Sequence, residues 1–188
     1  LEQAHFTLAL EGPSYRDDDI YTAQIYSIAL GGGMSSRLFQ EVREKRGLCY
    51  TIFAQAGAYS DTGMTTIYAG TSDAQIGELA NITIDELKRA ADTLSQAELD
   101  RARAQMKAGL LMGLESASNR AERLARMLQV WGKVPNLEDT VARIDAVDLD
   151  KLRTYAQSVA SSAKMATALY GPIAAAPDLS ALEARRAA

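Results

Sequence analysis

The sequence has little of the chemistry that builds a metal centre or a nucleophilic triad. Its 188 residues include one histidine, His5, and one cysteine, Cys49. A catalytic zinc generally takes three protein ligands rich in histidine or cysteine, so a zinc site made only of such ligands cannot be assembled from this chain. A Ser-His-Asp triad would have to use His5, and no G-x-S-x-G elbow is present. Because His5 stands in an alternating run, we interpret it as a strand residue.

Other shortages exclude further classes of protein. A single cysteine permits no intrachain disulfide, so nothing indicates an oxidising compartment. The net charge of -4, with Lys and Arg interleaved among the acids, provides no basic face for nucleic acid. The uncharged run over residues 20–36 is too short and too polar to span a bilayer. The start, "LEQAHFTLAL", has neither a basic n-region nor an initiator Met, which predicts a fragment or a processed product.

The bulk composition is that of a globular domain. Hydrophobic residues make up 47% of the chain and charged residues 23%. A chain of this length can bury a substantial core. No internal repeat or linker divides it, so we expect one domain over residues 1–188. The Ala-rich end, residues 175–188, is predicted to be a frayed tail.

Hydrophobic periodicity predicts few strands and many helices. Residues 4–10, "AHFTLAL", alternate as a half-buried strand does. Ser95 and Glu98 have the spacing of a capping box. We expect helices over 18–30, 35–46, 74–92, 96–115, 118–132, 137–145 and 149–160, and further strands over 49–59, 63–72 and 164–170. Because the strands do not alternate with helices, this order indicates an α+β two-layer sandwich. A mostly antiparallel sheet would carry helices on one face, unlike a doubly wound fold.

Three glycines, Gly31 to Gly33, join the first two predicted helices. "GGGMSSR" matches neither common phosphate-binding motif and follows a helix rather than a strand, so nucleotide binding is the weaker interpretation. We favour a tight turn in which glycine supplies positive φ and close backbone approach. Gly47, preceded by cationic residues, predicts a glycine stop for the second helix.

Arg43 and Tyr50 lie on either side of that stop. A helix followed by a reversal can place two such side chains together. Guanidinium and phenol both donate hydrogen bonds, so together they could hold a peptide carbonyl or stabilise a tetrahedral oxyanion. Spacing alone favours a packed tyrosine and a surface arginine. Further along, Arg120, Arg123 and Arg126 recur every three residues, where a solvated helix face is favoured over a site for an acidic partner.

One long stretch carries a family resemblance. "LGGGMSSRLFQEVREKRGLCYTIFAQAGAYSDTGMTTIYAGTS" resembles the C-terminal half of zinc metallopeptidases of the mitochondrial-processing-peptidase and insulinase/pitrilysin type. The likeness extends upstream through "AHFTLALEGPSYRDDDIYTAQIYSIALGGG" and continues weakly to the closing "LYGP", so it covers nearly the whole chain. Its R-x6-Y pattern, from Arg43 to Tyr50, is fairly specific. H-x-x-E-H, the zinc motif of the other half, is absent.

The resemblance implies a division of labour between two related α+β halves or subunits. The other half carries zinc, and this half closes over it and encloses an unfolded peptide. The residues matching Arg43 and Tyr50 reach the scissile region, so they are the implied catalytic and substrate-binding residues, acting in trans. Gly32 and Gly33 are further substrate-binding candidates, because a non-catalytic processing subunit has a longer glycine-rich loop here. No metal or cofactor is expected in this chain.

We therefore expect the non-catalytic half of a bacterial, cytoplasmic zinc endopeptidase, inactive alone. Its expected partners are the zinc-bearing half and an unfolded peptide, and the isolated half is a candidate homodimer. Nucleic acid and a membrane span are not expected. Two alternatives stay open. The first is a structural or partner subunit without a peptidase role, like core-protein relatives of the family. The second is an independent ligand-binding module that uses the glycine turn.

Overall fold

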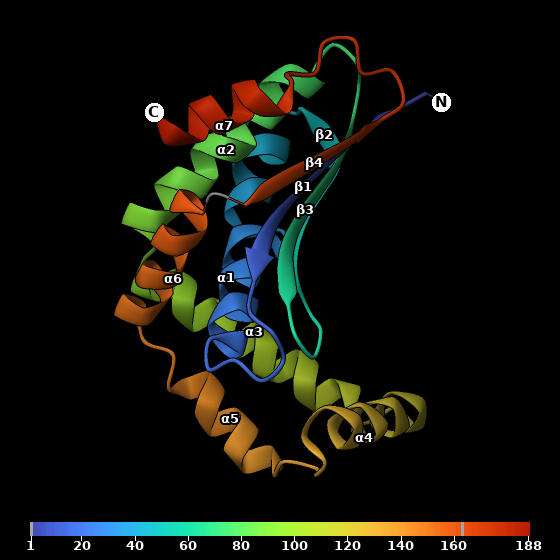
Figure 1. Ribbon diagram of the computed structural model, residues 1–188, viewed down its shortest axis with the longest axis vertical. Coiled ribbons are helices and arrows are strands. Elements are labelled where there is room, and N and C mark those ends of the chain that lie inside the picture. Colours follow the sequence, from blue (N-terminus) through green and yellow to red (C-terminus); the bar gives the residue numbers. More distant parts are fainter. Residues whose placement is uncertain (1, 163) are drawn as a thin grey trace.

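A computed structural model of the protein has four antiparallel strands in one sheet, with helices against one face (Figure 1). The structure describes residues 2–162 and 164–188. The elements in chain order are β1 (Ala4–Gly12), α1 (Ile20–Gly31), η1 (Phe39–Glu44), β2 (Cys49–Ala58), β3 (Gly63–Thr71), α2 (Ile76–Thr93), α3 (Gln96–Gly113), α4 (Ala117–Trp131), α5 (Leu137–Asp145), α6 (Leu149–Ser161), β4 (Met165–Tyr170) and α7 (Leu179–Ala187). The predicted α+β fold class is confirmed.

The sheet has the strand order β2-β3-β1-β4, so β1, near the start of the chain, is a neighbour of β4, near its end. β1 pairs with β3 on one side and with β4 on the other, both antiparallel. Phe6, Leu8 and Leu10 of β1 face the helices and are almost fully buried. Burial of each such side chain stabilises the fold by about 1.5–3 kcal/mol. β2 and β4 are the edge strands.

The opposite face of the sheet points away from the helix layer (Figure 1). Aromatic rings from different strands lie next to one another on it. His5 of β1 lies between Tyr68 of β3 and Tyr170 of β4, with ring centroids about 6 Å apart, and Phe53 of β2 lies 5.3 Å from Tyr68. A hydrogen bond of 2.8 Å joins His5 Nδ1 to the Tyr68 hydroxyl. The interpretation of His5 as a strand residue is confirmed.

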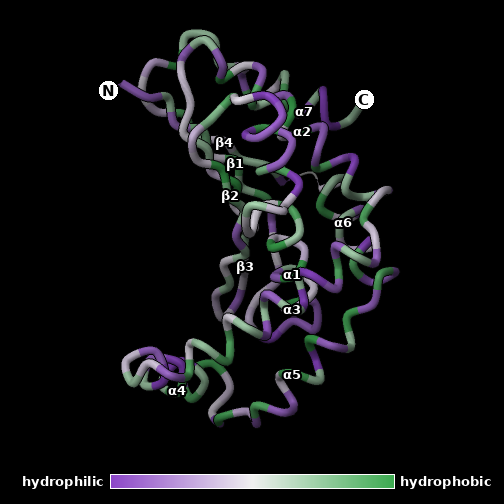
Figure 2. Tube along the Cα trace, turned by 180° about the vertical axis from the view of Figure 1, so that it is seen from behind, coloured by the Kyte–Doolittle hydropathy of each residue, from purple (hydrophilic) through white to green (hydrophobic). Residues whose placement is uncertain are grey.

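The helices form the second layer, and one of them leaves it. α1 lies against β2, while α2 packs with α6 and α7. The predicted capping box is confirmed, because Ser95 and Glu98 bond each other's backbone N–H at the start of α3. α4 projects from the far end of the layer in both views (Figures 1 and 2). Of the helices described, none is both long and apolar enough to cross a membrane.

Two expectations need correction. The predicted frayed tail over residues 175–188 is wrong for most of its length, because residues 179–187 form α7. Leu182 is 1% exposed, and Arg185 pairs with Asp85 of α2 at 2.6 Å, so this Ala-rich segment forms a helix that packs against the rest of the domain. The helix expected over 35–46 is present, but residues 39–44 of it form a π-helix.

Candidate functional site

The glycine turn owes its glycines to close packing. A Cβ on Gly31 would lie 2.4 Å from the backbone nitrogen of Ala54, so only glycine lets the end of α1 approach β2. A Cβ on Gly32 would lie 2.5 Å from the Cα of Ile28. The positive φ expected here is wrong: Gly32 has φ -87°, and the positive-φ glycines of the described chain lie elsewhere. Gln105 of α3 donates to the Gly32 carbonyl at 2.6 Å, which ties the turn down.

The π-helix η1 follows this turn. The Lys45 amide donates to the Gln40 carbonyl, five residues back, at 3.0 Å. Such wide turns are rare and frequently occur at functional sites. Gly47 then takes φ +63°, which is the left-handed conformation that the predicted glycine stop requires. The chain reverses there and enters β2.

The structure brings Arg43 and Tyr50 together. The Arg43 guanidinium carbon lies 4.6 Å from the centre of the Phe39 ring and 5.1 Å from that of Tyr50. Both are cation–π distances, so the guanidinium contacts both rings. Its nearest acid, Glu44, is 3.8 Å away, which makes a weak surface pair. Tyr50 is thus exposed rather than packed in the core, and Arg43 lies against its ring. That the pair acts on a substrate stays a prediction.

Tyr50 stands on a β-bulge. Cys49 pairs with Thr71 and Thr51 with Gly70, so Tyr50 is the extra residue between two consecutive pairs. A bulge turns a side chain away from the regular alternation of the strand. Tyr50 is 77% exposed, and its hydroxyl has no hydrogen-bond partner among the residues that the structure describes. An exposed tyrosine hydroxyl is thus presented at the surface, on a ring that packs against a cation.

A groove of about 440 Å³ links Arg43 to the glycine turn. Its walls are Gly31 to Met34, Phe39, Arg43 and residues 51–55 of β2. Gly32 and Gly33 therefore lie in one groove with Arg43. Tyr50 is not a wall residue, but its ring contacts Arg43. Phe39 is the site residue that sequence reasoning missed. Its position four residues before Arg43 on a predicted helix was the available signal.

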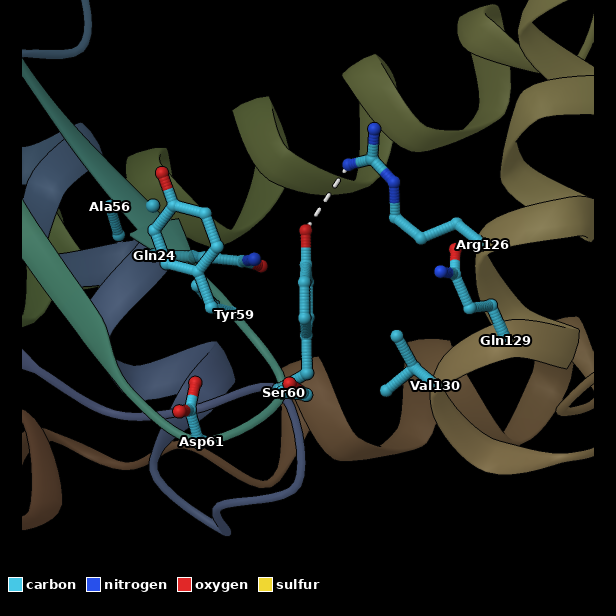
Figure 3. Close-up of a pocket in the computed structure, with 11 residues that line it drawn as sticks. Gln24, Ala56, Tyr59, Ser60, Asp61, Arg126, Gln129 and Val130 are labelled. Carbon is cyan, nitrogen blue, oxygen red and sulfur yellow. Dashed lines mark hydrogen bonds between the residues drawn. The ribbon is translucent and has the colours of Figure 1, made fainter.

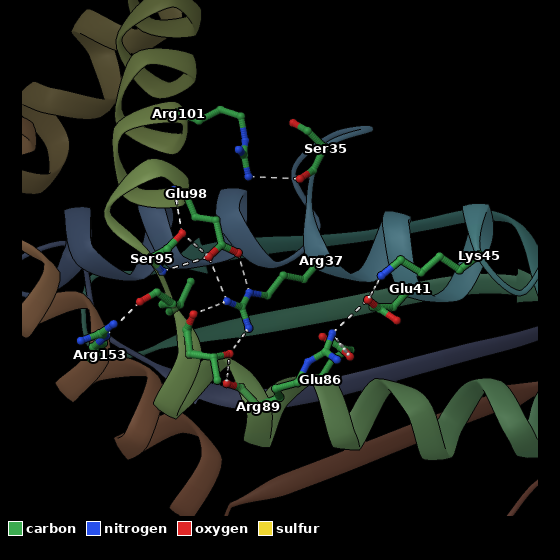
Figure 4. A network of polar contacts seen from close by, with 12 residues as sticks. Ser35, Arg37, Glu41, Lys45, Glu86, Arg89, Ser95, Glu98, Arg101 and Arg153 are labelled. Atoms are coloured by element: carbon green, nitrogen blue, oxygen red, sulfur yellow. Dashed lines mark hydrogen bonds and ion pairs between the residues drawn. The ribbon is translucent and has the colours of Figure 1, made fainter.

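A network of charges fixes η1 to the helix layer (Figure 4). The carboxylate of Glu41, 7% exposed as a residue, bonds Lys45, Arg46 and Arg89. The hydrogen bond from Lys45, followed by that from Arg46, lowers the pKa of Glu41 to about 2. Arg89 belongs to α2, where it also pairs with Glu86 at 2.6 Å. η1 is therefore tied electrostatically to α2.

A second ion pair secures the start of the same segment (Figure 4). Arg37 binds both carboxylate oxygens of Glu98 in α3, at 2.6 and 2.9 Å. Burial opposes ionisation of Glu98, but Arg37 and Ser95 outweigh it and lower its pKa to about 2. Since bidentate arginine–carboxylate pairs fix geometry, α3 holds the chain just before η1.

The residues present do not fit a zinc ion. Burial raises the pKa of the Cys49 thiol to about 11, although Arg43 opposes it, so the thiolate that binds metal is disfavoured. His5 Nδ1 is already bonded to Tyr68. Over residues 2–162 and 164–188, no group of three or more His, Cys, Asp or Glu side chains could hold a metal.

Bacterial proteins named as zinc proteases resemble the chain in sequence. An uncharacterized zinc protease of Streptomyces coelicolor is 37% identical over 159 residues, which cover 84% of this chain and 35% of the relative. The uncharacterized zinc protease YmxG of Bacillus subtilis is 35% identical over 161 residues, covering 84% of this chain and 39% of the relative. The chain thus spans well under half the length of these curated relatives.

Solved structures share the fold. A chain of the Inz-5-bound complex III2 of Candida albicans superposes with a TM-score of 0.90 at 21% identity, over 99% of this chain and 47% of that one. A protease from Helicobacter pylori superposes with a TM-score of 0.81 at 23% identity, over 90% of this chain and 41% of that one. Residues 1–106 match the model of the peptidase M16 inactive domain. The chain therefore belongs to the peptidase M16 family, as its inactive, non-catalytic domain.

Proposed function

We propose that this chain encloses and positions an unfolded peptide opposite the zinc-bearing half of an endopeptidase. Arg43 and Tyr50 would then act on the substrate carbonyl or its oxyanion at the zinc site of that half. One observation carries the proposal. The Arg43 cation packs against the Tyr50 ring, and Tyr50 is exposed on a bulge, with no hydrogen-bond partner for its hydroxyl in the described chain.

The chemistry of the pair matches a developing negative charge. The guanidinium is always protonated and the phenol donates one hydrogen bond, so both stabilise an oxygen that gains charge. Because the Arg43 guanidinium packs against the Tyr50 ring, each side chain limits the motion of the other. Donors that are held in place before the reaction need little reorganisation during it.

Exposed apolar side chains support a partner half. Leu124 and Leu128 of α4 are 41% and 53% exposed, and Leu111 and Met112 at the end of α3 are also exposed. Apolar side chains gathered at a projecting tip are typical of a surface that a partner covers. A zinc-bearing half would be that partner. A homodimer of the isolated chain and a location in the bacterial cytoplasm both stay predictions.

The experiment uses the complete two-half protein and the substitution Tyr50→Phe. The ring and its contact with Arg43 are kept, and only the hydroxyl is lost. Removal of one oxyanion donor typically costs ~10²–10³ in kcat, so we expect a fall of that order with little change in KM. Tyr21→Phe is the matched control, because Tyr21 stacks on Arg143 in the helix layer, away from the site. Unchanged kcat in Tyr50→Phe would remove the proposed role.

A structural or partner subunit is the second candidate. The likeness to a complex III2 chain is one of fold alone at 21% identity, and so does not choose between the two. The complete protein decides: chelator-sensitive cleavage of an unfolded peptide supports the peptidase half. Assembly with the other half but no cleavage, with or without zinc, supports the partner subunit. The 188-residue chain alone should cleave nothing in either case.

A further inference from the structure

A further cavity lies at the opposite end of the sheet from Arg43 and Tyr50. It has a volume of about 800 Å³ and opens where the β2–β3 hairpin faces α4 (Figure 3). Residues 56–61 of the hairpin form one wall, and Arg126, Gln129 and Val130 of α4 form another. The lining is completed by Tyr15, from the loop before α1, and by Gln24, from α1.

The walls of this hairpin pocket are held in place by the loop before α1. The Arg16 guanidinium donates to the Val130 carbonyl, at 3.1 Å from Nε and 2.8 Å from Nη2. That carbonyl belongs to the last turn of α4, where backbone acceptors lack helical partners. The Tyr15 amide donates to the Tyr59 carbonyl at 2.9 Å, and the Tyr15 ring lies edge-on to Trp131. The loop thus joins the tip of the hairpin to α4.

Arg126 supplies a cation to the pocket. Figure 3 shows it entering from α4, while Gln24 enters from α1 on the other side. Arg126 Nη1 donates to the Tyr15 hydroxyl at 3.2 Å, which orients the guanidinium. Arg126 takes part in none of the ion pairs found among residues 2–162 and 164–188. Arg126 is exposed, as expected for a solvated helix face, and it also lines the pocket.

Asp61 and two amides restrict what the pocket can take. Asp61 lines the hairpin side and, within the described chain, has no ion-pair partner. A carboxylate repels a polyanion such as a phosphate group, whereas it accepts hydrogen bonds from peptide N–H groups. The side-chain amides of Gln24 and Gln129 both donate and accept, as a peptide backbone does. One carboxylate carried on a peptide suits this arrangement.

We infer that the hairpin pocket binds a carboxylate of the peptide substrate through Arg126, at a distance from the bond that is cut. The carboxylate is the C-terminal group or an acidic side chain. The inference deepens the proposed function and rests on it for the nature of the ligand. Tyr15 orients Arg126, and Asp61 with the two glutamines contacts the adjoining backbone.

The length of β2 sets the spacing of the two sites. Tyr50 stands at its start and Ala58, in the pocket wall, at its end. Eight strand residues at ~3.3 Å each separate them by roughly 26 Å. An extended peptide of about eight residues spans that distance. Phe53 of β2 and Tyr68 of β3 lie on the sheet face between the two sites, so a peptide would pass their rings.

The test is a titration of the 188-residue chain itself, followed by the fluorescence of Trp131. Trp131 is the single tryptophan and touches Tyr15 in the pocket wall. The probes are three N-acetylated octapeptides of Ala, Gly and Ser: the C-terminal acid, its amide, and an amide with one internal Glu. We expect saturable binding of the acid, of the Glu peptide or of both. The Kd of the plain amide should be at least about tenfold higher than that of the carboxylate probe that binds.

Variants identify the cation. Because a hydrogen bond to a charged group is lost, Arg126→Gln should raise the Kd of the carboxylate probe by about 10- to 100-fold. Arg120→Gln, an exposed arginine on the same helix, should leave it unchanged. Equal binding of all three probes, no saturable binding, or an unaltered Kd in Arg126→Gln overturns the inference. Since no zinc or cleavage enters this assay, its failure is separate from that of the Tyr50→Phe experiment.

Discussion

Replacing Glu41 by Gln should loosen the π-helix that carries Arg43. The carboxylate of Glu41 bonds three cations, of which Lys45 and Arg46 lie in the chain after η1 and Arg89 in α2. Glutamine keeps the size and one acceptor oxygen but removes the charge. The three cations would then lose their shared partner, and Arg89 would keep only Glu86.

The size of the effect follows from the pKa of Glu41. The neighbouring cations lower it from 4.5 to about 2. At 1.36 kcal/mol per pKa unit, this displacement corresponds to at most about 3 kcal/mol of interaction. Lys45 and the two arginines are 40% exposed or more in their side chains, so solvent screens each pair. We therefore expect Glu41→Gln to lower the free energy of unfolding by about 1–2 kcal/mol at pH 7.

The sign of the pH dependence separates this effect from a packing defect. The pKa is depressed in the folded state, so the stabilisation is complete above the unfolded value near 4.5. It is lost as the pH falls towards the folded value of about 2. Urea unfolding of both proteins, followed by Trp131 fluorescence and circular dichroism, should give curves that differ most at pH 7. The difference should shrink between pH 4.5 and pH 2.

Glu44→Gln is the matched control for this prediction. Glu44 belongs to the same π-helix, but its side chain is 52% exposed and lies 3.8 Å from Arg43. A change within about 0.5 kcal/mol is expected for such a position. A Glu41→Gln protein that matches the Glu44→Gln protein at pH 7 would refute the reasoning. So would a deficit that stays constant down to pH 2.

Two further predictions concern close packing and burial near the site. Gly31→Ala should lower the free energy of unfolding, measured in urea, by about 1–3 kcal/mol, because its Cβ meets the Ala54 backbone. The Cβ of Gly33→Ala meets only the tip of Gln105, so its free energy of unfolding should change by less than about 0.5 kcal/mol. Equal losses in the two variants would contradict this account of the glycine turn. Burial raises the pKa of Cys49 to about 11, so at pH 8 it should react with a thiol reagent roughly 100-fold more slowly than free cysteine. The reaction rate should rise about tenfold per pH unit until the pH reaches this pKa. A rate that levels off near pH 9 would contradict the raised pKa.

The sheet and its helices could be predicted because their signals are local. The alternation of β1 and the capping box of α3 each predict a conformation from a few neighbouring residues, and the folded structure has that conformation in both places. The last helix could not be predicted in the same way. Its sequence is short and rich in alanine, so α7 depends on contacts across the chain, such as Leu182 in the core and Arg185 on Asp85.

The candidate site was predictable in its residues and not in its geometry. The family resemblance indicated Arg43 and Tyr50, but a π-turn and a β-bulge have no reliable sequence signature. Both result from the fit of η1 and β2 to their neighbours. The hairpin pocket is further from prediction, because Tyr15 and Arg126 are 111 residues apart and meet only through the fold. A run of arginines on a helix does not reveal which one finds a partner.

The two irregularities around Arg43 and Tyr50 are best explained together. A π-turn lacks the regular helical bonding pattern, and a bulge leaves one residue out of the ladder, so each is less stable than the regular element. Leu38, Val42 and Leu48 are buried beside them, and the Glu41 and Arg37 ion pairs fix the same segment. Packing and ion pairs thus hold an irregular backbone, and the outcome is an exposed tyrosine whose ring lies against a cation. π-turns and β-bulges are both frequent at functional sites. That combination is the physical reason to treat this stretch as a site rather than as a turn between helices.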